Sequence, residues 1–302
     1  MKKSNPDIGL NKLCWLFGIT RQAYYKNLKT VQFVEIEQEL LIKEVISIRK
    51  SHPRIGTRKL YIMLQPFMDE HNIKLGRDIF FDLLSKYSLL VRRRRRKIST
   101  TQSHHWLKKY SNLIREYTPN QPNMLYVSDI TYWKIETGFV YISLITDAYS
   151  HKIVGYNLAQ TLEAIESLKA LKMALLNVKK GIRLIHHSDR GVQYCSASYV
   201  NLLQDYGIAI SMTENGDPLE NAIAERINGI LKGEYLENYI VEDFNQAKQL
   251  LDAVIQLYNQ ERPHMSIGNM TPNYVHENQI ENVEKQWKNY YQKKESVNLL
   301  KD

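Results

Sequence analysis

Two carboxylates stand within or directly after apolar, strand-like segments, where acidic residues are uncommon. Asp129 lies inside MLYVSDITYWKI, and Asp189 follows GIRLI within HHSDRGVQY. On a strand whose two faces are covered, a carboxylate needs a cation or hydrogen bonds to offset its loss of water. Each residue is therefore a candidate ligand of a cation. The alternatives are an exposed strand face for Asp129 and a turn with Gly191 for Asp189.

A third carboxylate belongs to the helical segment NAIAERINGILKGEYL. At about 100° per residue, isoleucines and a leucine form an apolar stripe, and Asn221, Glu225, Asn228 and Lys232 form another face. Lys232 follows Glu225 by seven positions, so the two lie nearly above one another after two turns. This face offers a carboxylate, an amide and an ammonium to whatever lies opposite. An ordinary solvated face is the alternative.

Three predicted strands come first among the segments that position these groups, and helices and short strands alternate after them. MLYVSDITYWKI, GFVYISLITDAYS and HKIVGYNLAQT predict three consecutive strands joined by short turns. A helix within 162–178, the strand before Asp189, a helix within 196–207 and the strand IAISM follow. This order predicts a mixed α/β sheet whose first strand is central, and it makes Asp147 a turn residue at the end of the second strand.

The first third of the chain has helical patterns. LNKLCWLFGITRQAYYKNL predicts a helix-turn-helix-like pair with Thr20 as the N-cap of the second helix. A further helix is predicted over 35–50 and is ended by SHPRIG, and Thr57 is predicted to cap the helix RKLYIMLQPF. The helix RDIFFDLLSKYSLL precedes the basic run VRRRRRK. The pattern is typical of a DNA-binding helical domain with a basic linker; a helical bundle with a cationic tether is the alternative.

Positive charge is concentrated in the first part of the chain. Residues 1–116 carry a net charge of +14, and residues 117–302 carry −5. A basic segment attracts polyanions, of which nucleic acid is the commonest large one. The six consecutive positive charges of the run VRRRRRK repel one another, so we expect them to face solvent or phosphate. A merely solvated basic surface is the alternative.

Length and composition exclude several classes of protein. A chain of 302 residues suggests two or three domains. There is no run of about 18 apolar residues, which argues against a membrane span, and the start has no apolar segment typical of a secretory signal. The cysteines Cys14 and Cys195 lie far apart and show no zinc-type spacing. We therefore expect a cytoplasmic protein.

The order and spacing of several motifs resemble a known family. SDIT, HSDRGVQY, SMTENGDPLENAIAE and LKGEYL resemble motifs of the transposases of bacterial insertion sequences with a retroviral-integrase-like core. The resemblance is to the second-reading-frame protein of elements that encode their transposase in two overlapping frames. YNQERPHMSIGNMTP is similar to the terminal motif of that family, and SHPRIGTRKLYIML to its upstream helix-turn-helix region. The resemblance covers roughly residues 10 to 276.

By this resemblance the fold is α/β, with a ribonuclease H-like mixed-sheet catalytic core preceded by a helical DNA-binding region of helix-turn-helix type. We place the helical region at 1–91 and a basic linker at 92–116. The core is placed at 117–235 and a C-terminal helical extension at 236–302.

The resemblance implies that Asp129, Asp189 and Glu225 are the catalytic residues and the metal ligands. Oxygen ligands suit two magnesium ions, with manganese as the alternative. The family usually has Asp where this sequence has Glu220. Glu220 and Glu225 are about 140° apart around the helix, so both cannot point into one site.

Other residues are given roles by the resemblance. His187, Asn221 and Arg262 are predicted to contact substrate or the metal ligands. Contacts with DNA are predicted for Lys232 and for the basic run Arg92, Arg93, Arg94, Arg95, Arg96 and Lys97.

The resemblance implies a transposase that cuts and joins DNA strands at the ends of an insertion sequence. Water would first free a 3′-hydroxyl, and that hydroxyl would then attack a second phosphodiester. The expected partners are double-stranded DNA at element ends and target, further copies of the chain, and the first-frame protein, which is often fused upstream in that family. A plain metal-dependent nuclease of the same fold and a catalytically inactive DNA-binding protein are the alternatives.

Overall fold

The chain forms two compact units. The computed structural model describes residues 9–92, 106–115, 117–178, 181–214, 221–281 and 283. One unit comprises Met1–Ser51 with Gly56–Val91, and the other comprises His52–Ile55 with Arg92–Asp302. Among the described residues, every helix is too short or too polar to span a membrane.

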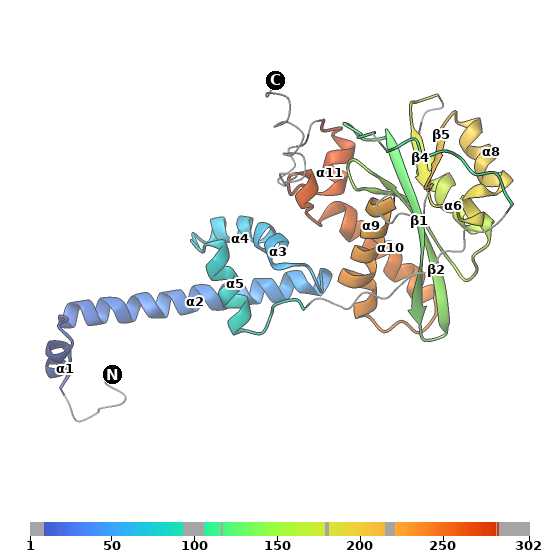
Figure 1. The fold of residues 1–302 in the computed structure, drawn as a ribbon. Helices are drawn as coiled ribbons and strands as arrows, with labels where there is room; N and C mark the ends of the chain where they lie inside the picture. The colour runs from blue at the N-terminus through green and yellow to red at the C-terminus, as the bar shows by residue number, and fades with distance from the viewer. Residues whose placement is uncertain are drawn as a thin grey trace, which may run out of the picture. The chain divides into compact units, whose positions relative to one another are not determined.

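The first unit is helical throughout its described residues. Its helices are α1 (Leu10–Leu16), α2 (Arg21–Ser51), α3 (Thr57–Met63), α4 (Gln65–Glu70) and α5 (Arg77–Lys86) (Figure 1). The apolar faces of α2 to α5 meet in one core. Its fully buried side chains are Leu41, Val45, Leu60, Leu64, Phe80 and Leu84.

The helix boundaries of this unit confirm one predicted cap and correct another. Thr20 accepts a hydrogen bond from the Ala23 N–H at 3.0 Å, as an N-cap residue does. The helix that follows is continuous from Arg21 to Ser51, so its predicted start at residue 35 is wrong; residues 21–34 contain no Gly or Pro that would interrupt it. Gly56, without a side-chain cap, precedes α3, and Thr57 is already helical, so the predicted Thr57 cap is also wrong.

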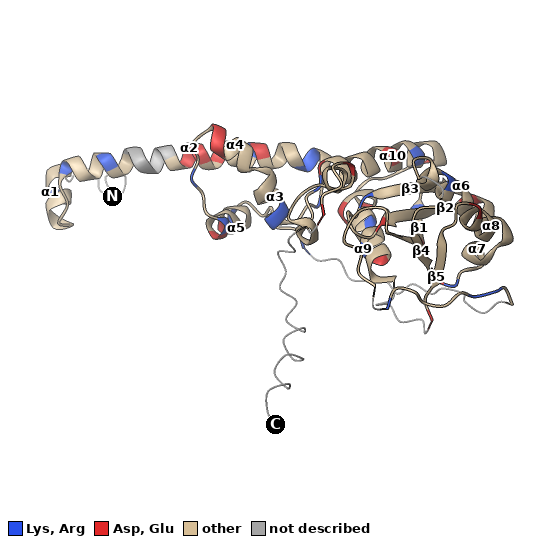
Figure 2. Ribbon diagram, turned by 90° about the horizontal axis from the view of Figure 1, so that it is seen from above, with Lys and Arg blue, Asp and Glu red and all other residues tan. Residues whose placement is uncertain are grey.

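Charge alternates along α2. Basic residues lie near both ends of the helix, at Arg21 and Lys26 and again at Arg49 and Lys50, while Glu35–Glu39 is an acidic stretch between them (Figure 2). The helix is therefore not uniformly basic. Much of the excess positive charge of this part of the sequence belongs to the run VRRRRRK, of which only Arg92 lies within the described residues.

The second unit is built on a five-stranded mixed sheet. The strands are β1 (Leu125–Ile135), β2 (Gly138–Asp147), β3 (Ile153–Ala159), β4 (Ile185–Ser188) and β5 (Ala209–Met212), in the order β3-β2-β1-β4-β5. The first three strands form an antiparallel meander, and β4 and β5 run parallel to β1. The predicted mixed α/β, ribonuclease H-like fold class is confirmed, and β1 is central as expected.

Helices cover both faces of this sheet (Figure 1). On one face, α6 (Ala164–Leu175), α7 (Val192–Cys195) and α8 (Ala197–Asp205) pack through a cluster that includes Leu171, Tyr199 and Leu203. On the other, α9 (Ala222–Ile230), the π-helical turn η2 (Leu231–Tyr235) and α10 (Phe244–Gln260) pack on Trp133 and Ile142. The 3-10 turns η3 (Leu236–Asn238) and η4 (Met265–Ile267) and the helix α11 (Pro272–Glu277) complete the unit. Side chains in the first part of β1 are therefore buried or half-buried, whereas Tyr132 and Lys134 near its end are exposed.

The end of β2 contains the predicted turn residue. Asp147 is fully buried, and its carboxylate accepts hydrogen bonds from the backbone N–H groups of Asn123, Tyr149 and Ser150. The Ser150 hydroxyl donates a further bond at 2.8 Å. Asp147 thus fixes the turn between β2 and β3, which confirms its interpretation as a turn residue.

One close approach holds α6 on the sheet. A Cβ atom on Gly155, in β3, would lie 2.3 Å from the backbone oxygen of Ala170 and 2.8 Å from the Cβ of Ala174. Only glycine allows the helix and the strand to approach this closely, because the nearest atom belongs to a backbone that cannot rotate away. The distance between α6 and β3 therefore depends on this one residue.

We expect Gly155→Ala to lower the free energy of unfolding by about 1–3 kcal/mol through overpacking. Urea denaturation followed by circular dichroism measures the change. Gly229→Ala is the matched control, since a Cβ at that exposed position of α9 meets nothing within 4 Å. That variant should gain up to about 1 kcal/mol from helix propensity. Equal stability of the two variants would contradict the close approach.

Candidate active site

Asp129 lies on the central strand and carries a strongly perturbed carboxyl group. Its Oδ2 accepts a hydrogen bond from the Asn228 side-chain amide at 2.7 Å. Burial, and then the nearby charge of Asp189, raise the pKa of Asp129 to about 7 against the lowering effect of the Asn228 hydrogen bond; the charge of Glu225 makes a smaller raising contribution. The site is therefore short of positive charge.

Asp189 lies beside Asp129 because of the strand register. In the parallel pair β1–β4, Val127 is matched with His187, and each aspartate follows its paired residue by two positions. The Asp189 Oδ1 accepts the backbone N–H of Gly191 at 2.9 Å. Asp189 therefore forms the turn with Gly191, and its charge also acts on Asp129; its role as a cation ligand stays a prediction.

Glu225 stands in the first turn of α9 and is exposed. Its charge reaches Asp129, although more weakly than that of Asp189. Among the described residues, no three His, Cys, Asp or Glu side chains are close enough together to hold one metal ion. The charges of Asp189 and Glu225 thus reach Asp129, but the three carboxylates are too far apart for all of them to bind the same ion. Glu220, the competing carboxylate, lies outside the described residues.

Two asparagines attach α9 to β1 beside the carboxylates. The amide of Asn221 donates to the backbone oxygen of Ser128 at 3.1 Å, and that of Asn228 donates to Asp129. Both side-chain Oδ1 atoms are buried, and no described residue donates a hydrogen bond to them. Asn221 is predicted from the sequence to contact substrate or the metal ligands, whereas no role is predicted for Asn228. Its position three residues after Glu225, on the same helical face, was the available sequence signal.

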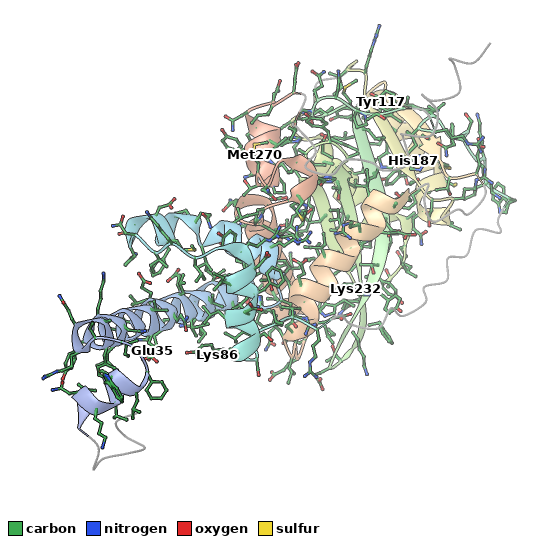
Figure 3. The ribbon with its side chains drawn as sticks, turned by 60° about the vertical axis from the view of Figure 1, so that its left-hand side comes forward. Glu35, Lys86, Tyr117, His187, Lys232 and Met270 are labelled. Carbon is green, nitrogen blue, oxygen red and sulfur yellow. The ribbon has the colours of Figure 1, made fainter. Side chains whose placement is uncertain are left out.

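Lys232 lies against β1 and not simply above Glu225. Its Nζ is 3.3 Å from the Thr131 Oγ1 and 4.3 Å from the centre of the Tyr132 ring, where it makes a cation–π contact (Figure 3). Residues 231–235 form a π-helical turn, so the regular period assumed from the sequence does not extend to Lys232. The correction brings the ammonium to the strand that carries Asp129.

Two other predicted residues, His187 and Arg262, are buried. His187 is 0% exposed, and its Nδ1 is 2.8 Å from the Ser211 Oγ on β5 (Figure 3). Arg262 is 1% exposed, forms a two-pronged ion pair with Glu234 at 2.8 Å and contacts His264. Burial disfavours the charge of Arg262, but the Glu234 carboxylate raises its pKa overall. Both side chains are thus buried and bonded within this unit, and their predicted contacts with substrate or the metal ligands stay predictions.

The basic run is described only at its first residue. Arg92 has an exposed side chain, and its backbone oxygen accepts a hydrogen bond from Arg54 at 2.5 Å. Arg93 to Lys97, predicted to contact DNA, lie outside the described residues.

Comparison with known proteins places this arrangement among related chains. Two profiles of the integrase core domain match residues 119–218 and 206–272. The chain is 32% identical over 266 residues to the insertion element IS600 uncharacterized 31 kDa protein of Shigella sonnei, covering 86% of this chain and 96% of that one. It is 28% identical to the transposase for insertion sequence element IS629 of the same organism, over 90% and 93% of the two chains.

The solved structures similar to this one include retroviral integrases. The catalytic core domain of the HTLV-2 integrase in complex with magnesium matches with a TM-score of 0.42 and 20% identity. That match covers 51% of this chain and 97% of the integrase core domain.

The raised pKa of Asp129 predicts a pH-dependent stability. The folded state binds the Asp129 proton more tightly than the unfolded chain does. The resulting contribution to the free energy of unfolding is fully present below about pH 4 and is lost as pH rises through about 7. In a metal chelator at pH 8, Asp129→Asn should therefore raise the free energy of unfolding by about 2–4 kcal/mol, with the gain shrinking toward pH 4.

Urea denaturation at a series of pH values measures this gain. Asp205→Asn, at an exposed position of α8, is the control and should show no pH-dependent gain. If the stability gained by Asp129→Asn stayed constant from pH 4 to pH 8, the raised pKa of Asp129 would be contradicted.

Proposed function

Because the chain belongs to the transposases of bacterial insertion sequences with an integrase core domain, we propose that it cuts and joins DNA strands at the ends of such an element. This activity is that of a polynucleotidyl transferase. The observation that carries the site assignment is that Asp129 on β1 and Asp189, directly after the neighbouring parallel strand β4, are close enough for the charge of Asp189 to raise the pKa of Asp129.

We propose that Asp129, Asp189 and Glu225 hold divalent cations, with magnesium as the natural ion. The donor set fits, because carboxylate oxygens are the preferred ligands of hard cations and the site lacks compensating positive charge. When bound, such ions supply activation of the attacking oxygen and stabilisation of the leaving one. Asp129 is fixed for this task by Asn228, and Asp189 by its turn at Gly191.

The order of events follows from the nucleophile available at the same site. A water molecule first attacks the phosphodiester at the element end and releases a 3′-hydroxyl. That hydroxyl then attacks a phosphodiester of the target, and the leaving 3′-oxygen of the target strand takes up a proton. The residues serve both steps unchanged, since only the attacking oxygen differs.

DNA is the proposed partner, and positive side chains are its proposed contacts. Lys232, held beside Thr131 and Tyr132, is placed to bind a phosphate next to the carboxylates. The run from Arg92 to Lys97 would add affinity that is independent of sequence and weakens with salt. Because two element ends must be joined in one event, the active form is proposed to be an oligomer on DNA.

We expect Asp189→Asn to lower strand joining by at least about a hundredfold while leaving DNA affinity within about twofold, because the amide keeps the turn at Gly191 but loses the charge. Incubation of labelled element ends with a target plasmid measures cleaved and joined products, and a gel-shift titration measures binding. Asp205→Asn should behave as the unaltered chain. Cleaved ends without joined product from the unaltered chain would indicate a nuclease instead.

Removal of divalent cations should abolish both cleavage and joining, and added magnesium should restore them. Magnesium should also stabilise the folded chain, by about 2.7 kcal/mol at a hundred times its Kd. Asp129→Asn should lose this stabilisation and Asp205→Asn should keep it. Thermal denaturation with and without magnesium tests the ligand assignment independently of activity; equal stabilisation of both variants would overturn it.

A further inference from the structure

An exposed aromatic patch covers the end of the β1–β2 hairpin. The Tyr132 side chain is 38% exposed and that of Phe139 is 55% exposed, and their rings make an edge-to-face contact at 5.7 Å. In the strand register Tyr132 is opposite Tyr141, and Lys134 is opposite Phe139. Residues that face each other across antiparallel strands share one face of the sheet, so these four side chains form the aromatic patch.

The core does not require the aromatic patch. The alternate residues of the hairpin, Trp133, Ile135 and Val140, are 2–4% exposed and pack in the cluster formed with α9 and α10. The patch lies on the opposite face, where two of its three rings are exposed. Single exposed apolar residues are ordinary, whereas a contiguous group beside a catalytic site marks a surface for binding.

The patch is joined to the carboxylate site by Lys232. Its ammonium lies over the Tyr132 ring at 4.3 Å and also reaches the hydroxyl of Thr131, which follows Asp129 by two residues. Tyr132 is three residues from Asp129 along β1, so the two side chains leave opposite faces of the strand. Lys232, which contacts both Thr131 and the Tyr132 ring, is the link between them.

Charge and ring exposure together specify the ligand. Lys232 and the exposed Lys134 surround the rings with positive charge, which suits a phosphate backbone better than the apolar surface of a second protein. The bases of duplex DNA are already stacked on one another. Unpaired bases have open faces and stack on aromatic side chains irrespective of sequence.

We propose that the aromatic patch stacks unpaired nucleobases of the DNA strand next to the reacting phosphodiester, while Lys232 and Lys134 contact its phosphates. This inference rests on the proposed function, which it deepens by naming a single-stranded segment as part of the substrate. The patch holds that segment unpaired where Lys232 reaches from the carboxylate side of β1 to the Tyr132 ring, and Tyr132 is a positioning residue for Lys232.

The test compares two DNA probes with the full chain. One is a blunt duplex of the proposed element end, and the other carries in addition a short unpaired extension containing 2-aminopurine, whose fluorescence is quenched by stacking. Phe139→Leu should weaken binding of the extended probe by roughly fivefold to a hundredfold and relieve the quenching, with blunt binding unchanged. Tyr132→Phe should retain the quenching, since the ring remains.

Tyr274→Leu, at a residue 54% exposed on α11, is the control for loss of an exposed aromatic ring and should match the unaltered chain. If Phe139→Leu bound the extended probe as tightly as the unaltered chain does, the proposal would be overturned. The proposal would also be overturned if Phe139→Leu kept the quenching but lost self-association in analytical ultracentrifugation, because the patch would then be a protein interface.

The Asp189→Asn variant separates this inference from the proposed function. It should retain ring-dependent quenching although it joins no strands. If the unaltered chain stacks the extension but joins no strands with magnesium, the proposed function fails while the base-stacking site stands. If it joins strands without ring-dependent stacking, only the further inference fails.

Discussion

The structure depends on the placement of two like charges on neighbouring parallel strands. Asp129 and Asp189 each lie two residues beyond a matched pair of β1 and β4, so formation of the sheet brings their carboxyl groups together. Burial and repulsion raise the pKa of Asp129 to about 7. The folded chain therefore has an electrostatic deficit that a proton or a bound cation can satisfy, and this deficit links the fold to its chemistry.

The helix that carries the third carboxylate is placed by amides and not by charges. Asn221 and Asn228 bond to the backbone and to the carboxyl of adjacent β1 residues, so α9 is held on the strand that carries Asp129. Glu225 stays exposed on the same helix. The π-helical turn that follows brings Lys232 onto β1 beside Tyr132. One helix thus supplies both negative and positive groups to a single strand.

Residues of the motif YNQERPHMSIGNMTP hold the elements that surround this arrangement. Asn259 bonds through its amide to both the N–H and the oxygen of Ile153, and the Tyr258 hydroxyl donates to the oxygen of His151. Arg262 forms an ion pair with Glu234, which lies two residues after Lys232 in the π-helical turn. A buried pair of this kind is costly to break because either partner alone would leave an unpaired charge. These residues therefore fix α10 and the π-helical turn.

The sequence by itself determined the strand and helix types, the central position of β1, the caps and turns at Thr20 and Asp147, and the carboxylates that are the candidate ligands. These features follow from local periodicity and from side chains that bond to their own neighbourhood. Only the tertiary structure decided where Lys232 points, that Arg262 and His187 are buried, and that Asn228 holds Asp129. Those outcomes depend on partners distant in the chain and on a local change of helical period. The spacing of residues along a single segment can place Asn228 on the face of Glu225, but it does not specify which distant residue that face meets.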